Sequence, residues 1–447
     1  MSLGRQDDPP GVIRANCVAA SRQNAAFLQL FRWRLSAESR YDAAMKSDHD
    51  YMRLALHLAR RGYGLTSPNP MVGAVLVKGG KIIGRGWHRR AGLPHAEIEA
   101  MYDTQKHGLD PRGATLYVTL EPCSTHGRTP PCTDAIITAG IKRVVVGTVD
   151  PNPKHSGQAF RILRRAGITA LRWGETPSSP SRRAKKSGLK RLSPHQTLAE
   201  ECLKLNEAFN HWICHRTPLV TVKAAMTLDG KIATADGESK WITGDKARAY
   251  AMQLRQGADV ILAGINTILA DDPSLTARTK MEDGRWKVVK PIRRIVLDSM
   301  ARTPLKAKVV TDQFAALTTI VVSKRAPKNR VAALARRVNV LVAPTSSSKF
   351  KVQNSKLDLK WLLKKLGSEN VTSLLVEGGG EVNASFLLGG FARRVAFFYA
   401  PKILGGRDSL KAVSGEGAAS LAEALQLREV EWRRLGPDLL LKALVAG

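Results

Sequence analysis

The chain has few cysteines, few aromatic residues and no long hydrophobic run. Its five cysteines in 447 residues are too few for a disulfide framework, so we expect a reducing compartment and a cytoplasmic protein. No stretch approaches the ~18 consecutive apolar residues that a membrane-spanning helix needs. We therefore expect no membrane partner.

Acidic residues are also scarce, with 38 Asp and Glu against 70 Lys and Arg, which gives a net charge of +32. Such a charge is typical of nucleic-acid-binding proteins. The basic residues are spread along the chain, however, and aromatic residues, which stack on single-stranded bases, make up only 6%. A positive surface equally suits phosphorylated metabolites, so nucleic acid is the alternative partner and not the leading one.

The length and composition indicate a globular protein of two or three domains, at about 150 residues each. Helical and strand patterns alternate from residue 48 to about 173 and again from residue 218, which predicts two α/β domains whose sheets contain parallel pairs. The stretch at 192–213 is typical of a connecting helix, and the basic run at 178–192 of a solvated linker, with a nucleic-acid arm as its alternative. The predicted bounds are 1–44 for a weakly ordered extension, 45–175 for the first domain, 176–195 for the linker and 196–447 for the second domain.

Three candidate metal ligands follow one another in the first domain. His95 opens "HAE", Cys123 closes "EPC" and Cys132 closes "PPC". One imidazole and two thiolates leave one tetrahedral position open, which is the arrangement of a catalytic zinc site with water as fourth ligand. Glu97, two residues beyond the histidine and not itself a ligand, is placed to carry the proton of that water. These residues predict a zinc hydrolase.

Plainer interpretations of these residues stay open. A His-x-Glu pair is often a surface helix start, and two cysteines are often buried thiols. A structural zinc site would need a fourth protein ligand, for which His88 and His126 are the nearby candidates. The order of all four residues, with a proline before each cysteine, favours the catalytic site.

The motifs resemble the zinc nucleoside deaminases, whose signature is His-x-Glu followed by Pro-Cys-x-x-Cys. Here eight residues separate the two cysteines, where the common signature has two. The stretches "TSPNPMVGAVLV", "GWHRRAGLPHAEIEA", "YVTLEPCSTHGRTPPCTDAII" and "DPNPKHSG" closely resemble the deaminase half of the bifunctional riboflavin-biosynthesis deaminase/reductases, in which the longer spacing is normal. The resemblance implies a cytidine-deaminase-like three-layer α/β/α domain over residues 45 to about 173, with Asn69 near the bound pyrimidine.

In the second half, "SLLVEGGGEVNASFL" runs from an apolar strand through three glycines into a helix. Such a turn lets phosphate approach the backbone, although an ordinary tight turn explains it equally well. Together with "TLDGKIATADGESKWIT", "LRQGADVILAGINTILADDPSLTAR" and "RRIVLDS", it resembles the reductase half of the same family, whose fold is like dihydrofolate reductase and whose cofactor is NADPH.

The resemblance implies two groups of site residues in this half. Those expected to contact the cofactor are Trp241, Thr267, Asp271, Gly379, Gly380, Glu381, Val382, Asn383, Ala384 and Ser385. Those expected to contact the substrate are Ser239, Arg255, Leu275, Arg278 and Glu377.

Simple chemistry supports some of these roles. Arg255 and Arg278 are suited to a ribose phosphate, and Glu377 to a pyrimidine amide edge. Arg255 as an exposed helix arginine and Trp241 as plain core are the alternatives, while the general acid of the reduction is not identified.

The sequence as a whole predicts one enzyme with two consecutive activities in riboflavin synthesis. The first is zinc-dependent hydrolytic deamination of a phosphoribosylamino diaminopyrimidinone, and the second is NADPH-dependent reduction of the ribosylamino product to a ribitylamino product. The expected partners are therefore small phosphorylated pyrimidines, and a homo-oligomer stays open. The alternative function is a basic RNA-binding or RNA-editing zinc deaminase.

Overall fold

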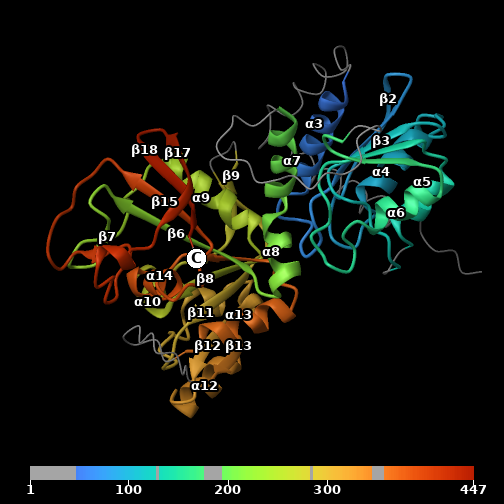
Figure 1. The fold of residues 1–447 in the computed structure, drawn as a ribbon. Helices are drawn as coiled ribbons and strands as arrows, with labels where there is room; N and C mark the ends of the chain where they lie inside the picture. The colour runs from blue at the N-terminus through green and yellow to red at the C-terminus, as the bar shows by residue number, and fades with distance from the viewer. Residues whose placement is uncertain (1–46, 127–129, 176–193, 282–284, 345–356, 447) are drawn as a thin grey trace, which may run out of the picture.

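The computed structural model describes residues 47–126, 130–175, 194–281, 285–344 and 357–446. They form two α/β units, each built around its own sheet (Figure 1). The predicted extension at 1–44 and the basic run at 178–192 lie outside the described residues. Within the described ranges, no helix combines the length and the apolar character that crossing a membrane requires.

The first unit contains a five-stranded sheet in the order β2-β1-β3-β4-β5. Its strands are β1 (Gly73–Lys78), β2 (Lys81–Trp87), β3 (Thr115–Val118), β4 (Arg143–Val146) and β5 (Thr169–Arg172). β1 and β2 form the predicted hairpin, and the intervening Gly79 and Gly80 have φ angles of 57° and 74°, which glycine adopts without strain. β3, β4 and β5 are parallel to one another.

Helices cover both faces of this sheet. They are α3 (Asp48–Ala59), α4 (Ala96–Lys106), α5 (Cys132–Thr138), α6 (Gln158–Arg165) and α7 (Pro194–Leu205). Side chains alternate along β1, so Leu76 packs with the residues of α4, α5 and α6, while Val75 packs with those of α3 and α7. The three-layer α/β/α arrangement predicted for this unit is confirmed.

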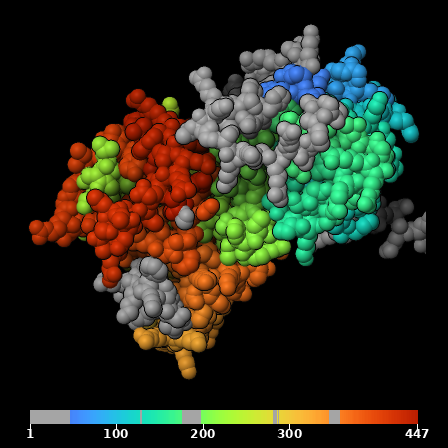
Figure 2. All heavy atoms as spheres, in the orientation of Figure 1, coloured from blue at the N-terminus to red at the C-terminus, as the bar shows by residue number. Residues whose placement is uncertain are grey.

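Two helices connect the units, where the sequence predicted one. α7 ends at Leu205 and α8 (Glu207–His215) begins two residues later. The side chain of Asn206, between them, accepts a hydrogen bond from the Met71 amide at 2.7 Å and donates one to the Met71 carbonyl at 2.9 Å. α7 packs beside α3 and α8 beside β6 and β14, so the connection passes from the first unit to the second (Figure 1). Figure 2 shows both units in the same orientation.

The second unit contains a nine-stranded sheet among the described residues, in the order β13-β12-β11-β8-β14-β6-β15-β18-β17. These strands are β6 (Leu219–Thr227), β8 (Val260–Gly264), β11 (Arg293–Leu297), β12 (Thr318–Ser323), β13 (Asn339–Ala343), β14 (Ser373–Val376), β15 (Arg394–Ala400), β17 (Leu427–Leu435) and β18 (Asp438–Val445). The strands from β13 to β15 run parallel, and β18 and β17 complete the sheet antiparallel. Shorter pairs are β7 (Lys231–Ala233) with β16 (Leu410–Lys411) and β9 (Ala277–Lys280) with β10 (Trp286–Lys290).

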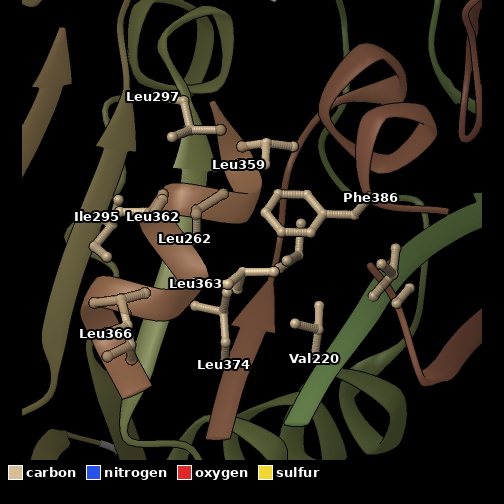
Figure 3. Close-up of a cluster of buried hydrophobic side chains, with 14 of the residues drawn as sticks. Val220, Leu262, Ile295, Leu297, Leu359, Leu362, Leu363, Leu366, Leu374 and Phe386 are labelled. Atoms are coloured by element: carbon tan, nitrogen blue, oxygen red, sulfur yellow. The ribbon is translucent and has the colours of Figure 1, made fainter. Parts of the chain in front are cut away.

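Helices flank this sheet on both sides. They are α9 (Asp245–Gly257), α10 (Ile265–Asp271), α11 (Lys308–Thr311), α12 (Lys328–Ala335), α13 (Leu359–Ser368) and α14 (Gly380–Leu387). Figure 3 shows Leu362 and Leu366 of α13 and Phe386 of α14 against Leu262 and Leu374 of neighbouring strands. α/β sheets of this kind bind ligands outside the carboxyl ends of their parallel strands. We therefore expect a ligand-binding site at the turns after β8 and β14, which end at Gly264 and Val376.

Candidate active sites

The three predicted metal ligands come together in the first unit. His95 directly precedes α4, Cys132 begins α5, and Cys123 lies in the loop after β3. The Nδ1 atom of His95 lies 3.5 Å from Sγ of Cys123 and 3.3 Å from Sγ of Cys132. Ligand atoms at 2.0–2.3 Å from a tetrahedral zinc ion lie roughly 3.5 Å apart, so the cluster has the size that zinc requires.

The protonation of this cluster also fits a bound cation. Hydrogen bonds from the side chain and amide of Cys132 and from His95 outweigh burial and lower the pKa of Cys123 to about 4. The hydrogen bond to Cys123 raises the pKa of His95 to about 9 against the effect of burial, and the same thiolate and burial raise the pKa of Cys132. Shared protons thus hold the three ligand side chains together. A metal ion that binds them would displace these protons.

Glu97 lies in the first turn of α4, buried beside the ligands. Burial raises the pKa of its carboxyl, the His95 charge opposes this, and the Cys132 thiol is within hydrogen-bonding reach. A buried carboxyl that holds a proton readily, next to a metal site and not part of it, is suited to proton transfer. In the part of the chain that the structure describes, the metal-ligand group consists of His95, Cys123 and Cys132.

His88 takes a supporting position instead of that of a fourth metal ligand. Its Nδ1 lies 3.0 Å from the Pro94 carbonyl oxygen, which can only accept, so Nδ1 carries the proton. Its Nε2 then accepts a hydrogen bond from Nδ2 of Asn69 at 3.1 Å. This fixes the Asn69 amide, leaving its Oδ1 as the acceptor that a ligand could use. His126, the other candidate, is exposed and lies 3.9 Å from Asp134.

Glu121, which the sequence analysis did not single out, organises the loop beside this site. Its buried carboxylate accepts hydrogen bonds from the amides of Asp150, Gly157 and Ala159 at 3.2, 3.0 and 3.0 Å. The loop at 150–157 is thereby tied to the segment that leads into Cys123. The sequence signal for this role is the glutamate of the motif "EPC", two residues before Cys123.

In the second unit, Arg255 and Glu377 form a buried ion pair. Nε and Nη2 of Arg255 donate to the Glu377 carboxylate at 2.7 and 2.9 Å, and Nη1 donates to the Thr276 carbonyl at 3.0 Å. Lys223 of β6, which the sequence analysis missed, places Nζ 3.6 Å from the same carboxylate. Each nitrogen of the Arg255 guanidinium is therefore engaged by a protein group, and Arg278 lies half-buried on β9.

Of the other predicted residues, Ser239 and Trp241 lie before α9, Thr267 and Asp271 lie in α10, and Leu275 follows α10. Ser239 donates to Asp271 at 3.0 Å, at the end of α10, the helix that also contains Thr267. Trp241 is 65% exposed, not part of the core, with Arg248 stacked over its ring. Leu275 is buried.

The glycine-rich turn after β14 meets the turn after β8. A Cβ on Gly378 would lie 2.5 Å from Cβ of Val382, and one on Gly264 would lie 2.7 Å from Cγ2 of the same valine. Both positions thus need glycine for close packing, and α14 begins at Gly380 with its first amides at this edge. Within α14, Asn383, Ala384 and Ser385 are buried. The side-chain amide of Asn383 donates a hydrogen bond to the Ala412 carbonyl.

Comparisons with known proteins agree with this division. Residues 45–148 match the family described as the cytidine and deoxycytidylate deaminase zinc-binding region, and residues 218–441 match the RibD C-terminal domain. The riboflavin biosynthesis protein RibD of Aquifex aeolicus is 42% identical over 394 residues, covering 88% of this chain and 97% of that protein. Its counterpart from Escherichia coli is 36% identical over 404 residues, covering 88% and 98%.

Solved structures agree as well. Acinetobacter baumannii RibD has a TM-score of 0.71 and 30% identity, covering 90% of this chain and 99% of that one. The diaminohydroxyphosphoribosylaminopyrimidine deaminase/5-amino-6-(5-phosphoribosylamino)uracil reductase of Thermotoga maritima has a TM-score of 0.68 and 34% identity, covering 89% and 98%. The matches do not support the RNA-binding or RNA-editing alternative. The chain belongs to the RibD family of bifunctional riboflavin-biosynthesis enzymes, with a zinc-binding deaminase domain followed by an NADPH-dependent, dihydrofolate-reductase-like domain.

Proposed function

We propose that His95, Cys123 and Cys132 hold the zinc ion of the deaminase and that Glu97 carries its protons. The observation that carries this assignment is the cluster of one imidazole and two thiols within 4.8 Å of one another, with a buried carboxyl beside it. When bound, zinc acidifies a water molecule so that a hydroxide-like nucleophile is available at neutral pH. The substrate would be the phosphoribosylamino diaminopyrimidinone, a small phosphorylated pyrimidine.

Glu97 would transfer a proton in two steps of this reaction. It takes a proton from the attacking water as the new C–O bond forms at the ring carbon that bears the amino group. It then gives that proton to the amino nitrogen, whose bond to carbon breaks and which leaves as ammonia. Asn69, whose amide His88 orients, accepts a hydrogen bond from a donor on the pyrimidine.

We propose that the reduction takes place at the carboxyl ends of β8 and β14. NADPH, when bound, supplies a hydride. The free amides at the start of α14 and the glycines before it would meet its phosphates, and Ser239, Trp241, Thr267 and Asp271 would contact the rest of the cofactor. Glu377 would accept from the pyrimidine amide edge, and Arg278 would bind the ribose phosphate. The residue bounds of the domains, a cytoplasmic location and a homo-oligomer are further parts of this proposal.

The test of the deaminase assignment compares two carboxyls on one helix. Glu97→Gln should reduce deamination by a factor on the order of 10³ or more, because the proton carrier is lost, while zinc content and NADPH-dependent reduction persist. Glu99→Gln is the matched control, since Glu99 pairs with Arg89 at 2.9 Å on the half-exposed side of α4. Deamination that survives in Glu97→Gln, or fails equally in Glu99→Gln, would contradict the assignment.

A further inference from the structure

We infer that the reductase domain supplies a positioning residue for deamination: Asp259 holds Ser67, and thereby holds Asn69 in the deaminase site. The inference rests on the proposed contact between Asn69 and the substrate. It assigns to the junction between the domains a part in substrate binding, beyond joining two enzymes in one chain.

Asp259 is itself fixed by the reductase domain. It lies immediately before β8, and its Oδ2 accepts hydrogen bonds from the amide and hydroxyl of Thr372, both at 2.8 Å, and from the amide of Ser373 at 3.1 Å. The same oxygen accepts a fourth hydrogen bond, at 2.8 Å, from the hydroxyl of Ser67 in the deaminase domain. Hydrogen bonds to an ionised carboxylate are shorter and stronger than those between neutral groups.

Ser67 passes this position on to Asn69 through a tight turn. The amide of Asn69 donates to the Thr66 carbonyl at 2.8 Å, so the backbone on both sides of Ser67 belongs to one closed turn. The Asn69 side chain then donates to His88, which donates to the carbonyl of Pro94, the residue before His95. Hydrogen bonds thus connect Asp259 of one domain to the surroundings of the metal ligand in the other.

On the side of the reductase domain, this turn borders a cavity. The cavity, of about 250 Å³, lies between the domains, and its lining includes Ser67, Asn69 and Asp259. Where side chains border a cavity, directional hydrogen bonds carry more of the task of fixing a loop. Other contacts join the domains independently, among them Tyr63 Oη to the Gln253 carbonyl at 3.3 Å. Loss of the Ser67 hydroxyl should therefore leave the domains joined and release the turn.

The test uses the full chain with the single change Ser67→Ala. We expect the KM of deamination to rise about five- to tenfold, less than the loss of a direct hydrogen bond to a charged group would cause, because Ser67 acts on the substrate only through Asn69; kcat should stay within about twofold. Zinc content and the kcat/KM of reduction should stay unchanged. Ser67→Thr, which keeps the hydroxyl, should restore most of the KM, and Tyr63→Phe, which removes a different contact between the domains, should leave it unchanged.

A third variant distinguishes a failure of the Asn69 contact from a failure of the positioning by Asp259. If Asn69→Ala leaves the KM of deamination unchanged, the proposed role of Asn69 is wrong, and the positioning role of Asp259 loses its basis. If Asn69→Ala raises the KM while Ser67→Ala does not, or while Tyr63→Phe raises it as much as Ser67→Ala, only the positioning by Asp259 is refuted.

Discussion

Replacing Glu377 by glutamine should destabilise the reductase domain in a way that depends on pH. The Glu377 carboxylate is buried between Arg255 and Lys223. Burial raises the pKa of Glu377, but the charges of Arg255 and Lys223 outweigh it and bring the pKa down to about 2 from an ordinary 4.5. At about 1.4 kcal/mol for each pH unit, the ionised carboxylate stabilises the folded state by about 3 kcal/mol at neutral pH.

The sign of the pH dependence follows from the lowered pKa. Above about pH 4.5 the carboxylate is ionised in both the folded and the unfolded chain, so its full contribution to the free energy of unfolding is present. As the pH falls from about 4.5 towards about 2, the unfolded chain takes up the proton first, and the contribution is lost. Glu377→Gln should therefore be less stable than the parent by about 3 kcal/mol at pH 7, with the difference shrinking in acid.

Hydrogen exchange of peptides from β6, β14 and α9, measured against urea concentration, reports this sheet separately from the deaminase domain. Glu381→Gln is the control, because Glu381 is exposed in the first turn of α14 and should change stability by less than about 0.5 kcal/mol. A Glu377→Gln variant as stable as the parent at pH 7, or destabilised equally at pH 7 and pH 3, would refute the reasoning.

Three further predictions concern packing and the loop beside the zinc site. Gly257→Ala would place a Cβ 2.0 Å from the Tyr63 hydroxyl, so it should separate the thermal transitions of the two domains in calorimetry; one unchanged transition would contradict this. Gly378→Ala, whose Cβ would lie 2.5 Å from Val382, should lower the melting temperature without nucleotide, whereas Gly379→Ala, with open space around its Cβ, should not. Glu121→Gln should speed hydrogen exchange at the amides of Asp150, Gly157 and Ala159 and raise the KM of deamination; unchanged exchange there would refute its role as the anchor of that loop.

The sequence was most informative where chemistry is local. His95 and Glu97 begin one helix, and the cysteines follow prolines, so their residue types predicted the zinc cluster that the structure brings together. The Gly79-Gly80 hairpin was predicted for the same reason, because two adjacent glycines permit one turn geometry that few other residues adopt.

Contacts between distant segments could not be predicted in this way. Arg255 and Glu377 are 122 residues apart, and they meet only because β14 lies beside β8, a strand order that no local pattern specifies. The sequence suggested that Arg255 could bind a phosphate, whereas in the structure its guanidinium pairs with the Glu377 carboxylate. Asn206 and Asp259 likewise acquire their roles from the way the two domains meet.

Zinc removal tests the central claim most directly, because the two activities depend on different sites of one chain. The account predicts that chelation removes about one zinc per chain and abolishes deamination, while NADPH oxidation with the deaminated pyrimidine continues unchanged. Added zinc should then restore deamination in the parent chain and fail to do so in Cys123→Ser and Cys132→Ser chains. Deamination that persists without zinc, or reduction that is lost with it, would contradict the account.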